Sequence, residues 1–242
     1  MTKNKVVLVT GGSKRIGTTI SEFFHSKGFN IALHYNHSKN DAISLSSSLN
    51  KLRKNSCDIY QANLTDPNEI NSLIDKVKQD TKKLNVLINN ASSFYPTPIE
   101  TADLDSWHDL SFTNLIAPFL LIQGFKDLLA QENGCVINIS DAIATKGIDN
   151  FSLYSAAKGG IEIITKSFAK ELSPDIRVNA VAPGAILWPE QDEKMEKEST
   201  LKTIPLGRIG EAKDIASAAF FITQSKYMTG QVIKVDGGRS LS

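Results

Sequence analysis

Short apolar segments alternate with longer amphipathic segments along almost the whole chain. The apolar segments read as strands, and they lie at 6–9, 30–34, 58–61, 86–88, 136–139, 177–181 and 232–235. Helical patterns fill the spaces between them, among them 41–54, 105–131, 152–172 and 211–223. Strands that are apolar throughout and separated by helices predict a parallel sheet covered on both faces. The expected fold is therefore a single-domain α/β, Rossmann-like doubly wound parallel sheet of about seven strands, flanked by helices.

We expect one domain over residues 1–242, because no linker, repeat or low-complexity segment divides the chain. A polar stretch from Pro189 to Thr200 interrupts the alternation, and we expect a substrate loop near 185–206. Lys and Arg total 27 against 26 for Asp and Glu, which gives no sign of a nucleic-acid or membrane partner. The histidines and cysteines show no metal-ligand spacing, so no metal site is expected. With no long apolar segment and no disulfide framework, we expect a cytoplasmic location.

A glycine-rich turn, TGGSKRIG from Thr10 to Gly17, joins the first strand to the first helix. Amide groups at a helix N-terminus, together with the helix dipole, favour a pyrophosphate, and glycine lets that ligand approach closely. Arg15 stands where a TGxxxGxG pattern has its middle glycine, and its side chain can reach a phosphate or an anionic substrate group. The alternative is a turn that closes a βα unit without a ligand. Its place between a strand and a helix favours a nucleotide.

The end of the second strand indicates which dinucleotide is bound. An acidic residue about 20 positions after the glycines would bind the adenosine ribose and select NAD. Residues 34–39, with the sequence HYNHSK, contain no carboxylate. Lys14, His37 and Ser38 can instead contact a 2′-phosphate, so the sequence favours NADPH/NADP. A solvated polar loop is the alternative interpretation.

Tyr154 and Lys158 are four residues apart in an expected helix, so both project from one face. A nearby ammonium group lowers the pKa of a tyrosine, which can then pass a proton to or from a substrate near neutral pH. Asp141 follows the fifth strand, at the edge of the sheet where ligands bind in such folds, although a helix cap is its alternative role. Asn114 lies between the fourth and fifth strands, and a buried core amide is its alternative.

As an ordered set, these segments resemble the short-chain dehydrogenases/reductases. The matching motifs are 10–17, Asn89-Asn90-Ala91, Asn114, Tyr154-x-x-x-Lys158, Pro183-Gly184 and Val235-Asp236-Gly237-Gly238. The resemblance implies that Tyr154 is the acid/base, that Lys158 also binds the nicotinamide ribose, and that Asn114 supports a proton-relay water. The cofactor contacts expected from the motifs and the resemblance are Gly11, Lys14, Arg15, Ile16, Tyr35, Asn36, His37, Ser38, Asn63, Leu64, Asn90, Ala91, Ser92, Ser140, Tyr154, Lys158, Pro183, Gly184 and Ile186.

One departure from the family pattern narrows the expected reaction. The family usually has a serine 13 residues before the tyrosine, whereas this chain has Asp141 there and Ser140 one step earlier. A serine hydroxyl orients a carbonyl oxygen. A carboxyl group can instead relay a proton or bind an amine or amidine-like edge. We therefore expect a substrate whose ring nitrogen, and not a ketone oxygen, receives the proton.

Three features together resemble the pteridine reductases within this family, namely Lys14-Arg15, Asp141 and the segment NASSFYP at 90–96. The resemblance implies that Arg15 helps to hold phosphate and pterin, and that Ser92 contacts cofactor and substrate. Phe94 would stack on the pterin opposite the nicotinamide, a loop aromatic that closes the core being the alternative. The expected substrate contacts are Arg15, Ser92, Phe94, Asp141 and Tyr154. The expected catalytic residues are Asn114, Asp141, Tyr154 and Lys158.

The expected activity is the NADPH-dependent reduction of dihydropterins to tetrahydro forms, with oxidised pterins and dihydrofolate as further candidate substrates. A 3-oxoacyl thioester or other carbonyl reductase of the same family fits every motif apart from Arg15, Phe94 and Asp141. An NADPH-binding regulator without catalysis is a third reading. The resemblance also implies a homotetramer built through the C-terminal region and the long helices that hold 115–122 and 161–168, although the core could equally bury their apolar faces.

Overall fold

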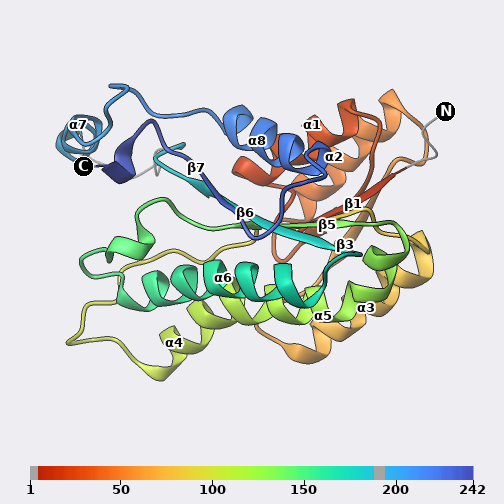
Figure 1. Ribbon diagram of the computed structural model, residues 1–242, viewed down its shortest axis with the longest axis horizontal. Helices are drawn as coiled ribbons and strands as arrows, with labels where there is room; N and C mark the ends of the chain where they lie inside the picture. Colours follow the sequence, from red (N-terminus) through yellow and green to blue (C-terminus); the bar gives the residue numbers. More distant parts are fainter. Residues whose placement is uncertain (1–4, 188–193, 242) are drawn as a thin grey trace.

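The computed structural model describes residues 5–187 and 194–241, which form a seven-stranded parallel sheet with helices on both faces (Figure 1). The strand order is β3-β2-β1-β4-β5-β6-β7, and every adjacent pair runs parallel. The strands are β1 (Val6–Val9), β2 (Asn30–Tyr35), β3 (Cys57–Gln61), β4 (Val86–Asn89), β5 (Cys135–Ile139), β6 (Arg177–Pro183) and β7 (Val232–Val235). The doubly wound α/β fold expected from the sequence is confirmed.

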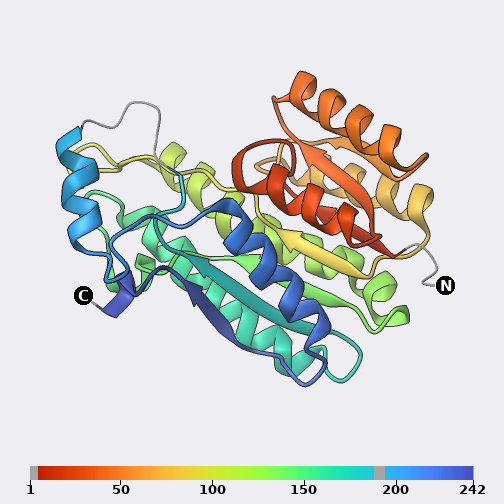
Figure 2. The same cartoon turned by 90° about the horizontal axis from the view of Figure 1, so that it is seen from above.

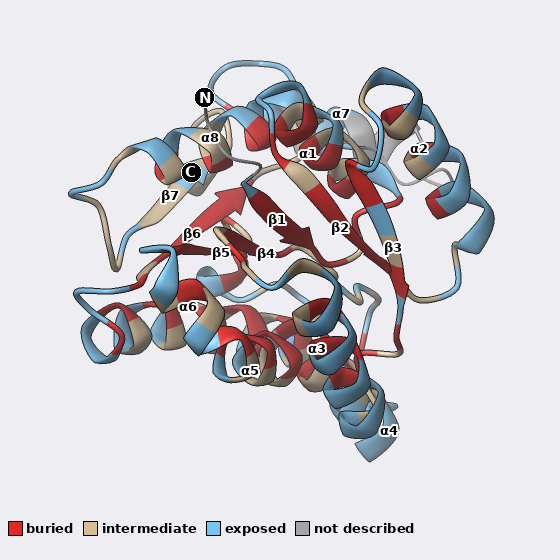
Figure 3. Cartoon of the chain, turned by 90° about the vertical axis from the view of Figure 1, so that its right-hand side faces the viewer, coloured by how far each residue is buried: buried red, intermediate tan, exposed pale blue. Residues whose placement is uncertain are grey.

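Two layers of helices cover the sheet (Figure 1, Figure 3). The helices are α1 (Arg15–Ser26), α2 (Lys39–Leu52), α3 (Pro67–Thr81), α4 (Leu104–Ser111), α5 (Ala117–Gln131), α6 (Ser152–Glu171), α7 (Lys194–Lys202) and α8 (Ala212–Gln224). Helices α1, α2 and α8 pack on one face, and α3, α5 and α6 pack on the other. Each face of the sheet therefore has its own apolar core.

Strand β1 shows why the strand segments are apolar without alternation. Val7 and Val9 enter the core under α1 and α8, whereas Val6 and Leu8 enter the core under α3 and α5. Successive side chains of a strand point to opposite faces, so a strand covered on both sides must be apolar at every position. All four residues are buried, and Figure 3 shows the strands as the buried centre of the molecule.

The single helix expected over 105–131 is divided into three parts. A π turn, Phe112–Ile116, separates α4 from α5. Pro118 follows directly, and because it has no amide hydrogen it cannot continue the helical hydrogen-bond pattern of the preceding turn. Asn114 lies within the π turn, and such local widening of a helix is frequent at functional sites.

The segment expected to form a substrate loop, 185–206, contains a helix, α7. Residues 188–193 of this segment lie outside the described residues. Helix α7 lies at one end of the molecule, near the 3-10 turn Arg239–Leu241 (Figure 1, Figure 2). Within 5–187 and 194–241, no helix is both long and apolar enough to cross a membrane.

Candidate active site

A cavity of about 910 Å³ lies at the carboxyl ends of the strands, beside the point where the strand order changes direction between β1 and β4. Ligands of open α/β sheets bind at such a point. Every predicted site residue except Asn114 lines this cavity. The predicted residues in its wall are Gly11, Lys14, Arg15, Ile16, Tyr35, Asn36, His37, Ser38, Asn63, Leu64, Asn90, Ala91, Ser92, Phe94, Ser140, Asp141, Tyr154, Lys158, Pro183, Gly184 and Ile186. Motifs that are far apart in the sequence therefore meet at one site.

The glycine turn is folded so closely that side chains are excluded from part of it. A Cβ atom on Gly17 would lie 2.1 Å from the carbonyl oxygen of Gly11, so only glycine fits there. The Asn90 Nδ2 group donates to the carbonyl oxygens of Thr10 and Gly11, at 2.9 and 3.2 Å. Helix α1 follows at once, and the first amides of a helix have no partner within it. The turn thus fits the pyrophosphate of a dinucleotide.

Arg15 keeps the backbone conformation of the glycine that the family pattern has at its position. Its φ angle is 52°, in the left-handed region that glycine adopts far more readily than other residues. The turn therefore retains a glycine-like backbone while an arginine side chain becomes part of the cavity wall. Local strain of this kind is often found at binding sites.

Where the adenosine was predicted to bind, side chains join the glycine turn to the segment that follows β2. The hydroxyl groups of Ser13 and Ser38 are hydrogen-bonded at 2.8 Å. Lys14 Nζ lies 3.3 Å from Asp41 Oδ2, in the first turn of α2. Residues 34–39 carry no carboxylate, but Asp41 comes two positions later and reaches the lysine. The ammonium group expected to meet a 2′-phosphate is therefore already paired with a carboxylate.

Three of the side chains predicted to be catalytic meet in the wall of the cavity. The Tyr154 hydroxyl donates to Asp141 Oδ2 at 3.0 Å. Asp141 Oδ1 accepts two backbone N–H groups, from two and three residues later, at 2.8 and 3.2 Å. Lys158 Nζ lies 5.7 Å from the centre of the Tyr154 ring, and both residues are buried. Helix α6 thus presents Tyr154 and Lys158 on one face, and the segment after β5 brings Asp141 to the tyrosine.

The electrostatics of Tyr154 differ from the prediction. Burial raises the pKa of Tyr154 above its usual value, and the charge and hydrogen bond of Asp141 raise it further. Burial lowers the pKa of Lys158 to about 8, although the Asp141 carboxylate opposes this change. The net direction of the Tyr154 pKa is therefore upward and not downward as predicted, because burial and the carboxylate on the hydroxyl dominate, while Lys158 Nζ donates to the carbonyl oxygen of Ile139 at 2.8 Å. Tyr154 therefore keeps its proton at neutral pH, as an acid must before it reacts, whereas efficient transfer of that proton needs a pKa nearer to the working pH.

Asn114 lies behind the cavity wall and contacts the loop that follows β4. Its Oδ1 accepts a hydrogen bond from the Ser92 hydroxyl at 2.6 Å. Its Nδ2 donates to the carbonyl oxygens of Ser93 and Leu110, each at 2.9 Å. Both amide hydrogens are therefore used, so among the side-chain atoms of Asn114 only the remaining lone pair of Oδ1 could accept from a proton-relay water. The contacts that the structure contains make Asn114 a support for Ser92.

Ser140, next to Asp141, is directed away from Tyr154. Its hydroxyl donates to Glu162 Oε1 at 2.8 Å, one helical turn beyond Lys158 on α6. Of the two neighbours after β5, only Asp141 has a hydrogen bond to Tyr154. The substitution of aspartate for the family's serine is therefore not compensated by the serine one position earlier.

Phe94 forms an aromatic cluster with two residues of the α6 region. Its ring stacks on Phe151 with centroids 4.5 Å apart and an angle of 15° between the planes. It also meets the Tyr154 ring edge-on, at 4.8 Å and 76°. Phe94 is 54% exposed, so one face packs on Phe151 while part of the ring remains open to the cavity. Stacking of this ring on a pterin stays a prediction.

Several residues of the cavity wall were not singled out from the sequence. They are Ser13, His34, Thr65, Ser93, Asp109, Thr113, Ile139, Ala185, Leu187, Thr200 and Arg239, together with Gly17 of the glycine motif. Most of them adjoin a predicted residue, so the motifs indicated their region. Thr200 belongs to the segment expected to form a substrate loop, and Arg239 directly follows the motif that ends at Gly238. Asp109 on α4 comes from a segment without a recognisable motif, and only the fold brings it to the site.

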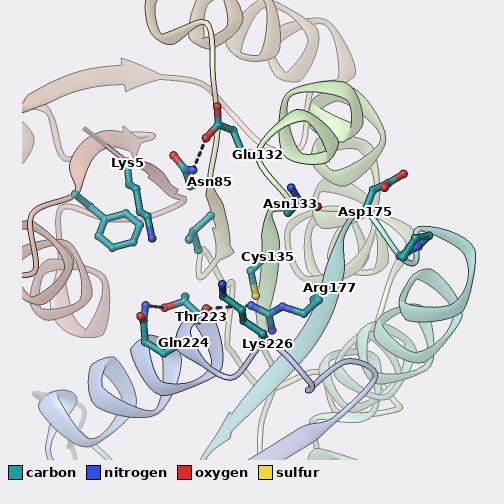
Figure 4. Close-up of a pocket in the computed structure, with 13 residues that line it drawn as sticks. Lys5, Asn85, Glu132, Asn133, Cys135, Asp175, Arg177, Thr223, Gln224 and Lys226 are labelled. Atoms are coloured by element: carbon teal, nitrogen blue, oxygen red, sulfur yellow. Dashed lines mark hydrogen bonds between the residues drawn. The ribbon is translucent and has the colours of Figure 1, made fainter. Parts of the chain in front are cut away.

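A second cavity, of about 500 Å³, lies at the amino ends of β4, β5 and β6 (Figure 4). The Arg177 guanidinium donates to the carbonyl oxygens of Ile222, Thr223 and Met228 and so caps the end of α8. Cys135 is buried, and burial raises the pKa of its thiol to about 11. Arg177 and Cys135 therefore contribute to the stability of the fold. The described residues also contain no group of three or more His, Cys, Asp and Glu side chains that could hold a metal ion.

Comparisons with known proteins cover nearly the whole chain. A family model described as enoyl-(acyl carrier protein) reductase matches residues 11–240. Pteridine reductase 1 of Leishmania tarentolae is 34% identical, over 98% of this chain and 96% of that protein. The 3-oxoacyl-[acyl-carrier-protein] reductase FabG of Staphylococcus aureus strain Mu50 is 36% identical, over 98% and 99%. The FabG protein of Thermotoga maritima is 34% identical, over 98% of each chain.

Proposed function

The chain belongs to the short-chain dehydrogenase/reductase family of oxidoreductases, and from this we propose that it is an NADPH-dependent pteridine reductase. The proposed substrates are dihydropterins, with oxidised pterins and dihydrofolate as further substrates. The observation that carries the proposal is the 3.0 Å hydrogen bond from the Tyr154 hydroxyl to Asp141 Oδ2. A carboxylate beside the acid suits protonation of a ring nitrogen, where the family's serine would orient a carbonyl oxygen.

The proposed reaction joins one hydride and one proton to the C6=N5 bond of a dihydropterin. When bound, NADPH would supply the hydride that adds to C6. Tyr154 donates its proton to N5, and Asp141 holds the hydroxyl in position for that transfer. Lys158, as a cation, stabilises the tyrosinate that remains until solvent returns the proton. With an oxidised pterin, the hydride goes to C7 and the proton to N8.

The other predicted contacts position the two ligands. Arg15 and Phe94 line the cavity, and a flat ring could stack on the face of Phe94 that is not packed against Phe151. Ser92 is held by Asn114 at 2.6 Å, next to the same space. Thr200 of α7 also lines the cavity, which supports a substrate-covering role for the 185–206 segment.

The preference for NADPH over NADH rests on the adenosine end of the site. Lys14, His37 and Ser38 line it, and residues 34–39 contain no carboxylate that could bind the ribose hydroxyls. A cation and hydroxyl groups favour a 2′-phosphate. The expected result is a lower KM for NADPH than for NADH.

The test is NADPH consumption by the purified protein with dihydrobiopterin, dihydromonapterin, dihydrofolate and acetoacetyl-CoA. We expect turnover with the pterins, and a loss of about 100-fold or more in kcat for Tyr154→Phe with NADPH binding retained. Tyr227→Phe is the matched control, because Tyr227 is fully exposed and lies outside the cavity. Full activity of Tyr154→Phe would refute the acid role.

A 3-oxoacyl thioester reductase is the second candidate function, and the FabG proteins at 34–36% identity favour it. Acetoacetyl-CoA turnover without any pterin turnover would select it. Asp141→Ser would then be neutral or beneficial, whereas a pteridine reductase would lose activity.

The proposed assembly is a homotetramer. Phe119 on α5 and Ile163 on α6 are 37% and 60% exposed, and apolar side chains on long helices suit contacts between subunits. A mass from light scattering tests this, and a monomer mass would contradict it. The cytoplasmic location stays a prediction.

A further inference from the structure

His34 lies at the end of β2, beside the glycine turn, and is 1% exposed. The Gly11 N–H donates to His34 Nδ1 at 3.0 Å. The Gly12 N–H donates to the His34 carbonyl oxygen at 2.9 Å. The amides of the first two glycines of the turn therefore both donate to this one residue.

The contact of the second ring nitrogen defines the tautomer of His34. Nε2 lies 3.0 Å from the carbonyl oxygen of Ala62, which can only accept a hydrogen bond. Nε2 must therefore carry the hydrogen, and Nδ1 must be the acceptor for Gly11. Burial lowers the pKa of His34 to about 4, so the ring is neutral at physiological pH and this arrangement persists.

We propose that His34 is the positioning residue of the glycine turn, and that its Nδ1 fixes the Gly11 amide so that the backbone beyond it is ready to receive the cofactor's pyrophosphate. Asn90 binds the carbonyl oxygens of the turn, and His34 binds its amides, so the turn is held from two sides. The inference rests on dinucleotide binding, which is part of the proposed function, and does not depend on which substrate is reduced.

The turn needs such support because of its glycines. Gly11 has a φ angle of 57°, and glycine has more backbone freedom than any other residue. Without the Nδ1 acceptor, the Gly11 amide loses its partner and the turn occupies other conformations. The apparent affinity for a ligand falls in proportion to the fraction of molecules in the competent conformation. Weaker NADPH binding is therefore the expected consequence, with hydride transfer in the assembled complex little changed.

Two variants separate the two ring nitrogens. His34→Asn places an oxygen near Nδ1 and keeps the acceptor for Gly11, whereas His34→Gln places an amide near Nε2 and keeps only the donor to Ala62. We expect the NADPH Kd, measured by cofactor fluorescence, to rise about tenfold in His34→Gln and at most about twofold in His34→Asn. The KM for NADPH should follow the Kd, with kcat at saturating NADPH retained.

His25→Asn is the matched control for the loss of a buried histidine's hydrogen bond. His25 is 7% exposed, its Nε2 is hydrogen-bonded to Ser56 Oγ at 2.8 Å, and it lies outside the cavity. Its variant should lose thermal stability without a change in the NADPH Kd. If His34 had only a structural role, the His34 variants would likewise lose thermal stability without a change in the NADPH Kd.

Four results would overturn the inference. An unchanged Kd in His34→Gln, or equal weakening in both His34 variants, would show that the Nδ1 acceptor does not position the turn. Nitrogen NMR of the wild-type ring gives an independent answer if a variant does not fold, because a protonated Nδ1 contradicts the proposal. Binding of NADPH by the wild type in these experiments leaves the proposed function standing, whereas a wild type that binds neither NADPH nor NADH overturns both.

Discussion

Replacing Arg15 with glycine should make the protein more stable and less active at the same time. Arg15 has a φ angle of 52°, and the left-handed conformation costs a non-glycine residue about 1–2 kcal/mol. The greater freedom of glycine in the unfolded chain offsets about 0.5–1 kcal/mol of this. The net gain in the free energy of unfolding is about 0.5–1 kcal/mol, which raises Tm by about 1–4 °C in a chain of this size.

Arg15→Ala separates the two effects, because it also removes the guanidinium group but keeps the left-handed strain. Both variants should show a higher KM for the pterin or the cofactor, and only Arg15→Gly should show a higher Tm in a thermal melt. Lys82→Gly is the matched control, since Lys82 ends α3 in the same conformation, with φ 55°, and lies outside the cavity. It should gain stability with unchanged activity. An Arg15→Gly protein no more stable than Arg15→Ala would refute the reasoning.

Two further predictions concern the charges of the site. In Asp141→Asn the pKa of Lys158 should fall below its value of about 8, because the Asp141 carboxylate opposes the lowering that burial causes. The alkaline limb of the pH profile of kcat/KM should then move to lower pH. A limb that does not move would show that the titration of Lys158 does not determine it. Asp41→Asn should release Lys14 from its 3.3 Å ion pair for the 2′-phosphate and lower the KM for NADPH roughly two- to fivefold at low salt. The KM for NADH should stay constant, and an equal change for both coenzymes would contradict this explanation.

The sequence predicted the sheet well because burial on both faces leaves little freedom in composition. Each strand was expected within two residues of its observed ends, as with 30–34 against Asn30–Tyr35 and 177–181 against Arg177–Pro183. The π turn at Phe112–Ile116 was not foreseen. Apolar spacing shows which face of a helix is buried, but it does not show that a hydrogen bond has shifted by one residue.

The sequence predicted which residues line the candidate site better than it predicted the contacts among them. Tyr154 and Lys158 are one helical turn apart in the sequence, and this spacing suggested that the lysine sets the tyrosine pKa. The decisive partner is Asp141, which comes from another element, so no local spacing reveals its contact with the hydroxyl. The links from His34 to Gly11 and from Lys14 to Asp41 likewise depend on how β2 and α2 approach the turn.

The strand order has a consequence for synthesis of the protein on the ribosome. Strand β1 pairs on one side with β2, but its other neighbour is β4, so Val7 meets Val86 across a long stretch of chain. A nascent chain that has emerged only through α3 therefore presents an open edge of β1, with unpaired N–H and C=O groups. Pairings over such distances form slowly, so the emerging first half of the sheet is where chaperone contact or misassembly would begin.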